Sequence, residues 1–132
     1  MRDFMHSDSI VETIPAKEMD KWPSARIKHE INRSRIEDRI IRAIIAERRL
    51  QESKWGIQTH SDFKWMSILM EEVGEAAAAV NDRPNYDNQS ESAKDDYAPI
   101  IEELIQVAAV AVAYLEDILY YIEEDEPDKV NQ

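Results

Sequence analysis

The amino-acid sequence predicts an all-α domain, and two observations carry that prediction. Apolar residues recur at helical spacing in three long segments of the chain. Glycine occurs only twice in 132 residues, whereas β-rich folds need glycine in their tight turns. With 43% hydrophobic residues the chain can build the core of one domain, and it is too short for two ordinary ones.

The first predicted helix covers about residues 30–54. Arginine and glutamate fill one side of it, and the other side carries an apolar stripe of Ile36, Ile40, Ile44 and Ile45. Gly56 is expected to end this helix, because glycine readily adopts the left-handed conformation that closes a helix. The mixed, polar residues 1–29 are interrupted by Pro15 and Pro23 and are expected to form an extension, with one short helix at most.

Two more helices are predicted after Gly56. One covers about residues 63–80, and Ser61 or Asp62 can cap its first turn. A polar loop then leads to a helix that is expected to begin near Asp96 or Tyr97 and to continue to about Glu123. Pro99 falls in the first turn of this last helix, where the missing N–H costs little.

The last predicted helix is apolar over well over half of its circumference. A surface helix of a monomer needs only one apolar stripe, so the excess indicates burial on two sides. We therefore expect a helical bundle completed by homo-oligomerisation, as a homodimer or a tetramer. The domain itself is expected to span residues 30–125, between the extension at residues 1–29 and an acidic tail at residues 126–132.

Composition and charge exclude several classes of site and partner. The absence of cysteine excludes disulfides and Cys-ligated metal centres, and it is compatible with a reducing cytoplasm. The net charge of −12 opposes binding to the phosphate backbone of nucleic acids. Residues 1–6 do not resemble a signal peptide, and the longest apolar run, 107–115, is far shorter than the roughly 20 residues that span a bilayer. We expect a cytoplasmic protein with no nucleic-acid or membrane partner.

Two polar pairs interrupt the apolar sides of the second and third predicted helices. Glu72 and Glu75 are three residues apart and share a helix face, and Glu103 and Gln106 repeat this spacing. Carboxylates buried without partners cost several kcal/mol each, so a cation would account for them, and their oxygens suit Mg²⁺ or Mn²⁺. The alternative is a set of partly exposed acids paired with arginines, since the chain has 28 acidic residues.

The order of these residues resembles the signature of a known enzyme superfamily. Glu71-Glu72-x-x-Glu75 followed by Glu103-x-x-Gln106 is similar to the Glu-Glu-x-x-Glu and Glu-x-x-Asp motifs of all-α NTP pyrophosphatases, which include MazG-like proteins and dimeric dUTPases. The stretches Lys54-Trp55-Gly56-x-Gln58-x-His60 and Gln106-Val107-Ala108-Ala109-Val110-Ala111 resemble a short MazG-like branch. The resemblance covers about residues 45–120 and leaves out the first 30.

The resemblance implies a MazG-like helical bundle that holds Mg²⁺, or Mn²⁺, at its carboxylates. Glu72, Glu75 and Glu103 match the metal ligands of the family, and Gln106 occupies the position of the family's aspartate. An amide oxygen can ligate Mg²⁺ but brings no negative charge. Glu71 matches an additional acid that orients or activates a water.

Four residues before the first carboxylate motif are candidates for nucleotide binding. Trp55 can stack on a base, and Gln58 can read a base edge. His60 can contact phosphate or polarise water, and Lys54 can neutralise phosphate. Each also has a simpler interpretation: Trp55 as a helix-end anchor, Gln58 as a turn cap, and His60 and Lys54 as ordinary surface or loop residues.

Three functions are compatible with this sequence. The first is an Mg²⁺-dependent nucleoside-triphosphate pyrophosphohydrolase, which converts a (d)NTP to a (d)NMP and pyrophosphate. The second is a nucleotide sensor without turnover, which Gln106 favours. The third is a structural helical interaction protein, which the alanine-rich helices and acidic surface would suit. Mg²⁺ should raise the thermal stability in the first two cases and leave it unchanged in the third.

Overall fold

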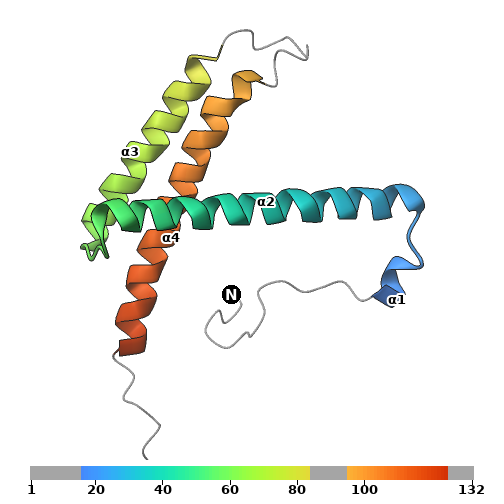
Figure 1. The fold of residues 1–132 in the computed structure, drawn as a ribbon, viewed down its shortest axis with the longest axis horizontal. Coiled ribbons are helices and arrows are strands. Elements are labelled where there is room, and N and C mark those ends of the chain that lie inside the picture. Colours follow the sequence, from blue (N-terminus) through green and yellow to red (C-terminus); the bar gives the residue numbers. More distant parts are fainter. Residues whose placement is uncertain (1–15, 84–94, 125–132) are drawn as a thin grey trace, which may run out of the picture. The chain divides into compact units, whose positions relative to one another are not determined.

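A computed structural model describes residues 16–83 and 95–124 (Figure 1). These residues form α-helices and one 3₁₀ turn and contain no strand, which confirms the all-α prediction for the described part of the chain. The elements are α1 (Ala16–Met19), α2 (Ser24–Trp55), α3 (Asp62–Asn81), η2 (Asp95–Tyr97) and α4 (Ala98–Glu124). The acidic tail expected at residues 126–132 lies outside the described residues.

The chain divides into two compact units, Met1–Asp38 and Arg39–Gln132. In the first unit, α2 begins at Ser24 rather than near residue 30. The carbonyl of Pro23 accepts the backbone N–H groups of Arg26 (2.9 Å) and Ile27 (3.2 Å), and it thereby opens the helix. The early turns of α2 carry few apolar residues, so the apolar stripe on which the prediction rested starts later than the helix itself.

The ends of the helices in the second unit follow the predicted local chemistry. Gly56 has a φ of 72°, and its N–H donates to the carbonyl of Glu52 at 2.8 Å, so it closes α2 in the left-handed conformation. Ser61 is the N-cap of α3, and its hydroxyl accepts the N–H of Lys64 at 3.2 Å. The short segment between α2 and α3 is therefore fixed at both of its ends.

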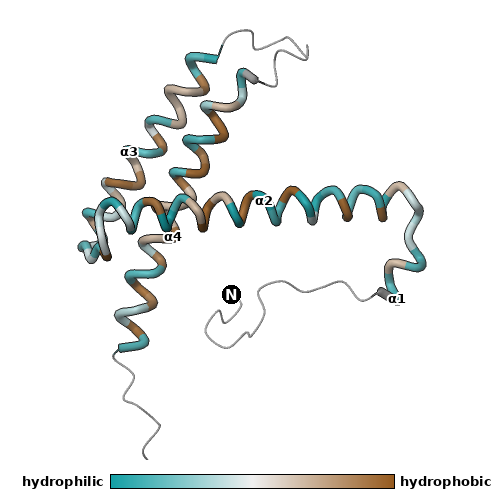
Figure 2. Tube along the Cα trace, viewed as in Figure 1, coloured by the Kyte–Doolittle hydropathy of each residue, from teal (hydrophilic) through white to brown (hydrophobic). Residues whose placement is uncertain are grey.

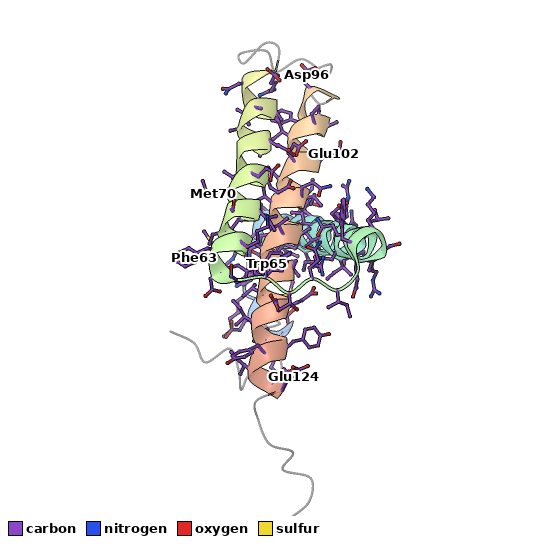
Figure 3. All side chains as sticks on the ribbon, turned by 90° about the vertical axis from the view of Figure 1, so that its left-hand side faces the viewer. Phe63, Trp65, Met70, Asp96, Glu102 and Glu124 are labelled. Carbon is purple, nitrogen blue, oxygen red and sulfur yellow. The ribbon has the colours of Figure 1, made fainter. Side chains whose placement is uncertain are left out.

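Helices α3 and α4 pack side by side in opposite directions (Figures 1 and 3). The centre of the contact is Trp65, which is 2% exposed and packs with Val110 and Ala113. Small residues allow the two helices to approach closely, and Ala109 on α4 is fully buried. Phe63, by contrast, points away from α4 and is exposed (Figure 3).

Helix α4 is rich in hydrophobic residues (Figure 2), and many of them are exposed in the single chain. Its exposed large apolar residues are Ile101, Leu104, Leu115, Leu119, Tyr120, Tyr121 and Ile122. By length and composition alone, α4 is also a helix that could cross a membrane, although soluble core helices pass the same test. Its acidic residues Glu116 and Asp117 make hydrogen bonds with groups from α2 and α3, so this part of α4 contributes to the packing of the second unit.

Candidate metal and nucleotide site

Three carboxylates from two helices converge in the second unit. Glu72 and Glu75 extend from α3 and Glu103 extends from α4, and one oxygen atom of each lies within 4.8 Å of the other two. These are the three acids that the sequence spacing singled out. The antiparallel pairing of α3 and α4 brings them together, because α3 presents two acids and α4 presents one to the same place.

The acids of this cluster are less buried than the sequence pattern predicted. Glu72 and Glu103 are half-buried, whereas Glu75 is exposed. No polar or charged side chain among the described residues is fully buried. The expectation that both Glu72 and Glu75 occupy core positions is therefore wrong for Glu75, because α3 is covered on one side only and Glu75 lies beyond that side.

Electrostatics at the cluster favour binding of a cation. Burial, and then repulsion from Glu75 and Glu103, raises the pKa of Glu72 above its ordinary value, with smaller contributions from Glu71 and Glu47. Within the described residues, no arginine forms an ion pair with any of the three clustered acids; Arg33 pairs with Glu30 and Glu37, and Arg48 pairs with Glu116. The interpretation of these acids as partners of arginine is therefore not supported, and the donor set fits a hard divalent cation.

A groove of about 820 Å³ runs beside the cluster, between the C-terminal part of α2, the α2–α3 segment, α3 and α4. Three predicted nucleotide contacts, Lys54, Trp55 and Gln58, line it. So do Glu72 and Gln106, and Glu72 therefore belongs to both the carboxylate cluster and the groove wall. Volumes of this size are typical of sites for small molecules.

Asp117 on α4 anchors the segment between α2 and α3. Its Oδ2 accepts the indole N–H of Trp65 at 2.7 Å and the backbone N–H of His60 at 3.1 Å. The hydrogen bond from Trp65 is the main cause that holds the pKa of Asp117 below its ordinary value. The ring of His60 meets Trp65 edge-on at 4.9 Å, and its Nε2 lies 3.4 Å from Oε1 of Gln58. His60 is therefore a tethered residue beside the groove rather than part of its lining.

Gln106 is connected to α2 by a second set of contacts. Its Oε1 accepts a hydrogen bond from Nε2 of Gln51 at 3.3 Å. Gln51 in turn accepts from Arg48, which is paired with Glu116 on α4. The remaining predicted site residue, Glu71, is exposed and lies next to Glu72, outside the lining of the groove.

Sequence reasoning missed Asp117, Glu116, Arg48 and Gln51. One signal was present: Glu116 and Asp117 interrupt the apolar positions of the last helix, as Glu103 does. The partners of these acids could not be read from spacing. Arg48 and Glu116 are 68 residues apart, and Gln51 and Gln106 are 55 apart.

Comparison with known proteins assigns no relative to the chain. No known protein family, curated protein or solved structure matches it. The MazG-like resemblance thus rests on short motifs, and the function is inferred from the geometry and chemistry of the site.

Proposed function

We propose that the protein is a metal-dependent nucleoside-triphosphate pyrophosphohydrolase, which hydrolyses a (d)NTP to a (d)NMP and pyrophosphate. One observation carries the proposal. Carboxylates of Glu72, Glu75 and Glu103 converge within 4.8 Å, and Glu72 also lines the groove in which Lys54, Trp55 and Gln58 stand. A cation held by this cluster would lie at the edge of a space large enough for a nucleotide.

Glu72, Glu75 and Glu103 would hold Mg²⁺ or Mn²⁺, because their oxygens are hard ligands and their mutual repulsion is relieved by a cation. The motif alone would make Gln106 a fourth ligand, although its oxygen already accepts a hydrogen bond from Gln51. A bound divalent cation supplies charge neutralisation on the phosphates and acidifies water. It also reconciles a chain of net charge −12 with an anionic substrate.

The protein's own residues divide the remaining tasks. Glu71 would accept a proton from the attacking water, whose oxygen forms a bond to the α-phosphorus while the bond from that phosphorus to the α–β bridging oxygen breaks. The leaving group is pyrophosphate. Lys54 would neutralise phosphate charge, and Trp55, which is 70% exposed, offers a free face on which a base can stack. Gln58 would contact a base edge, and His60 would keep Gln58 in place through their side-chain contact.

We also propose that the active protein is a homodimer or tetramer with a MazG-like bundle arrangement. The exposed apolar residues of α3 and α4 support this assembly, since a monomer would leave them in water. A cytoplasmic location remains our expectation from the sequence.

A nucleotide sensor is the second candidate function. It is favoured by Gln106, which contributes no charge to the cluster and whose oxygen is already engaged by Gln51. A sensor would bind a nucleotide with Mg²⁺ and release no pyrophosphate.

Purified full-length protein, incubated with Mg²⁺ or Mn²⁺ and a panel of common and modified NTPs, tests the proposal through pyrophosphate release. Glu75→Ala should lower turnover by orders of magnitude, because metal positioning and charge stabilisation are lost together. Glu102→Ala is the matched control, since Glu102 is an exposed acid on α4 outside the cluster. If the wild-type protein releases no pyrophosphate but binds a nucleotide in calorimetry, the sensor function replaces the enzyme.

A further inference from the structure

A chain of hydrogen bonds crosses from α4 to α2 and back to α4. Arg48 donates from Nε and Nη2 to the two carboxylate oxygens of Glu116, at 3.3 and 2.9 Å. Its Nη1 donates to Oε1 of Gln51 at 3.1 Å, and Nε2 of Gln51 donates to Oε1 of Gln106 at 3.3 Å. All four residues line the groove.

Because arginine can only donate, it determines which atom of each glutamine donates and which accepts in this series of hydrogen bonds. A guanidinium group has donors and no acceptor, so Gln51 must turn its oxygen toward Arg48. The amide nitrogen of Gln51 is then the group that donates to Gln106, and Gln106 accepts with its oxygen. The bidentate pair with Glu116 holds Arg48, whose side chain is only 15% exposed. The orientation of both amides therefore follows from the position of one ion pair.

This orientation determines what Gln106 can offer to the groove. Its oxygen faces Gln51, so its Nε2 is directed elsewhere, and within the described residues this nitrogen makes no hydrogen bond. Gln106 shares the groove wall with Glu72, which is one of the clustered acids. Because Gln106 lines the groove, its amide nitrogen is available as a donor to an anionic oxygen of a ligand bound there.

We propose that Gln106 is a hydrogen-bond donor to a phosphoryl oxygen of the nucleotide, and that Arg48 and Gln51 are positioning residues that orient it. The inference rests on the proposed function and deepens it. It assigns Gln106 to the substrate instead of the metal, although the motif places it among the metal ligands. An aspartate at this position would be an acceptor only, so the glutamine changes the role of the position from metal binding to phosphate binding.

Enzyme kinetics on a double-mutant cycle of Gln51 and Gln106 test whether Gln51 acts by orienting Gln106. Gln106→Met should raise KM for the NTP about tenfold or more, as expected for a lost hydrogen bond to a charged group, with a much smaller change in kcat. Gln51→Met should raise KM in the same direction, and it should have no further effect in the Gln106→Met background. Additive effects of the two substitutions would overturn the positioning role. Arg49→Met is the control on α2, because Arg49 is exposed and does not line the groove.

Gln51→Glu provides a second variant that keeps the contact with Arg48 and so protects the fold. A glutamate can accept from Arg48 but cannot donate to Gln106, so the Gln106 amide should reverse and present its oxygen to the groove. KM should then rise as far as it does in Gln106→Met. An unchanged KM, in a variant whose circular dichroism and melting temperature match those of the wild type, would contradict the orienting role of Gln51.

Metal affinity measured without nucleotide shows whether Gln106 is a hydrogen-bond donor to the substrate or a ligand of the metal. In titrations of Mn²⁺ followed by electron paramagnetic resonance, Gln106→Met should keep the Kd of the wild type within about twofold, whereas loss of a true metal ligand weakens binding about tenfold or more. Glu75→Ala serves as the positive control for ligand loss. A tenfold weaker Mn²⁺ complex in Gln106→Met would overturn the proposal. A wild-type protein that neither binds nor hydrolyses NTPs would instead overturn the proposed function, which keeps the two failures distinct.

Discussion

Replacement of Asp117 by alanine should release the segment between α2 and α3 and destabilise the domain. One carboxylate oxygen holds both the indole N–H of Trp65 and the backbone N–H of His60, at 2.7 and 3.1 Å. Trp65 is 2% exposed, so its indole N–H loses its acceptor in a largely buried position when the carboxylate is removed. The substitution therefore leaves a buried donor unpaired and frees the backbone at His60.

The size of the effect follows from these two bonds. An unsatisfied buried donor costs about 1–3 kcal/mol, and a hydrogen bond to a charged acceptor contributes about 1.5–3 kcal/mol. The two terms share one acceptor and are not additive, so Asp117→Ala should lower the free energy of unfolding by about 2–4 kcal/mol. For a domain of this size that corresponds to a melting temperature lower by about 10 °C or more. Asp117→Asn keeps an acceptor oxygen and should lose only about 1 kcal/mol, since the charge lies near solvent.

The pH dependence of this stabilisation has a definite sign. The hydrogen bond from Trp65 holds the pKa of Asp117 below its ordinary value, so folding favours the ionised carboxylate. Its stabilisation is fully present above the unfolded-state pKa and is lost as the pH falls through the folded-state pKa. The difference in stability between the wild type and Asp117→Asn should therefore be constant near neutral pH and shrink in the acid range.

Urea unfolding followed by circular dichroism measures both quantities, with chelator present so that metal binding does not contribute. Glu123→Ala is the matched control, because it removes an exposed carboxylate from the same helix. It should change the free energy of unfolding by less than about 0.5 kcal/mol. If Asp117→Ala behaves like this control, the anchoring role of Asp117 is refuted.

Three further predictions concern charge, assembly and backbone conformation. In the presence of a chelator, Glu72→Gln should stabilise the protein at neutral pH by less than about 1 kcal/mol, seen as a higher melting temperature. Because the pKa of Glu72 is raised, this gain should disappear as the pH falls through that pKa. Mg²⁺ should no longer stabilise the variant. Met70→Glu, at an exposed position on α3, should convert an oligomer to a monomer in light scattering, and an unchanged mass would contradict a contact there. Gly56→Ala, at a position where φ is 72° and the space is open, should lower the free energy of unfolding in urea by about 1–2 kcal/mol. Gly74→Ala, within α3, should instead raise it by about 0.5–1 kcal/mol.

Local chemistry explains which features could be predicted from the sequence. The left-handed Gly56, the Ser61 cap and the carboxylates at helical spacing depend on neighbours a few residues away, and the structure has them where the sequence placed them. The register of one helix against another depends on side-chain packing instead. For that reason neither the exposure of Glu75 nor the contact between Arg48 and Glu116 could be derived from the order of residues.

The geometry of α3 separates the proposed catalytic cluster from the proposed subunit contact. An α-helix turns about 100° per residue, so exposed Met66, Met70 and Val73 lie within about 60° of one another around α3. By the same measure Glu72 lies about 20° from Trp65, within the strip that packs against α4, and about 100–160° from these three apolar residues. A second copy seated on the Met66–Met70–Val73 stripe would therefore bury apolar surface without covering the acids. Nucleotide access and assembly can coexist in this arrangement, and a variant that breaks the assembly at Met70 should retain its affinity for Mn²⁺.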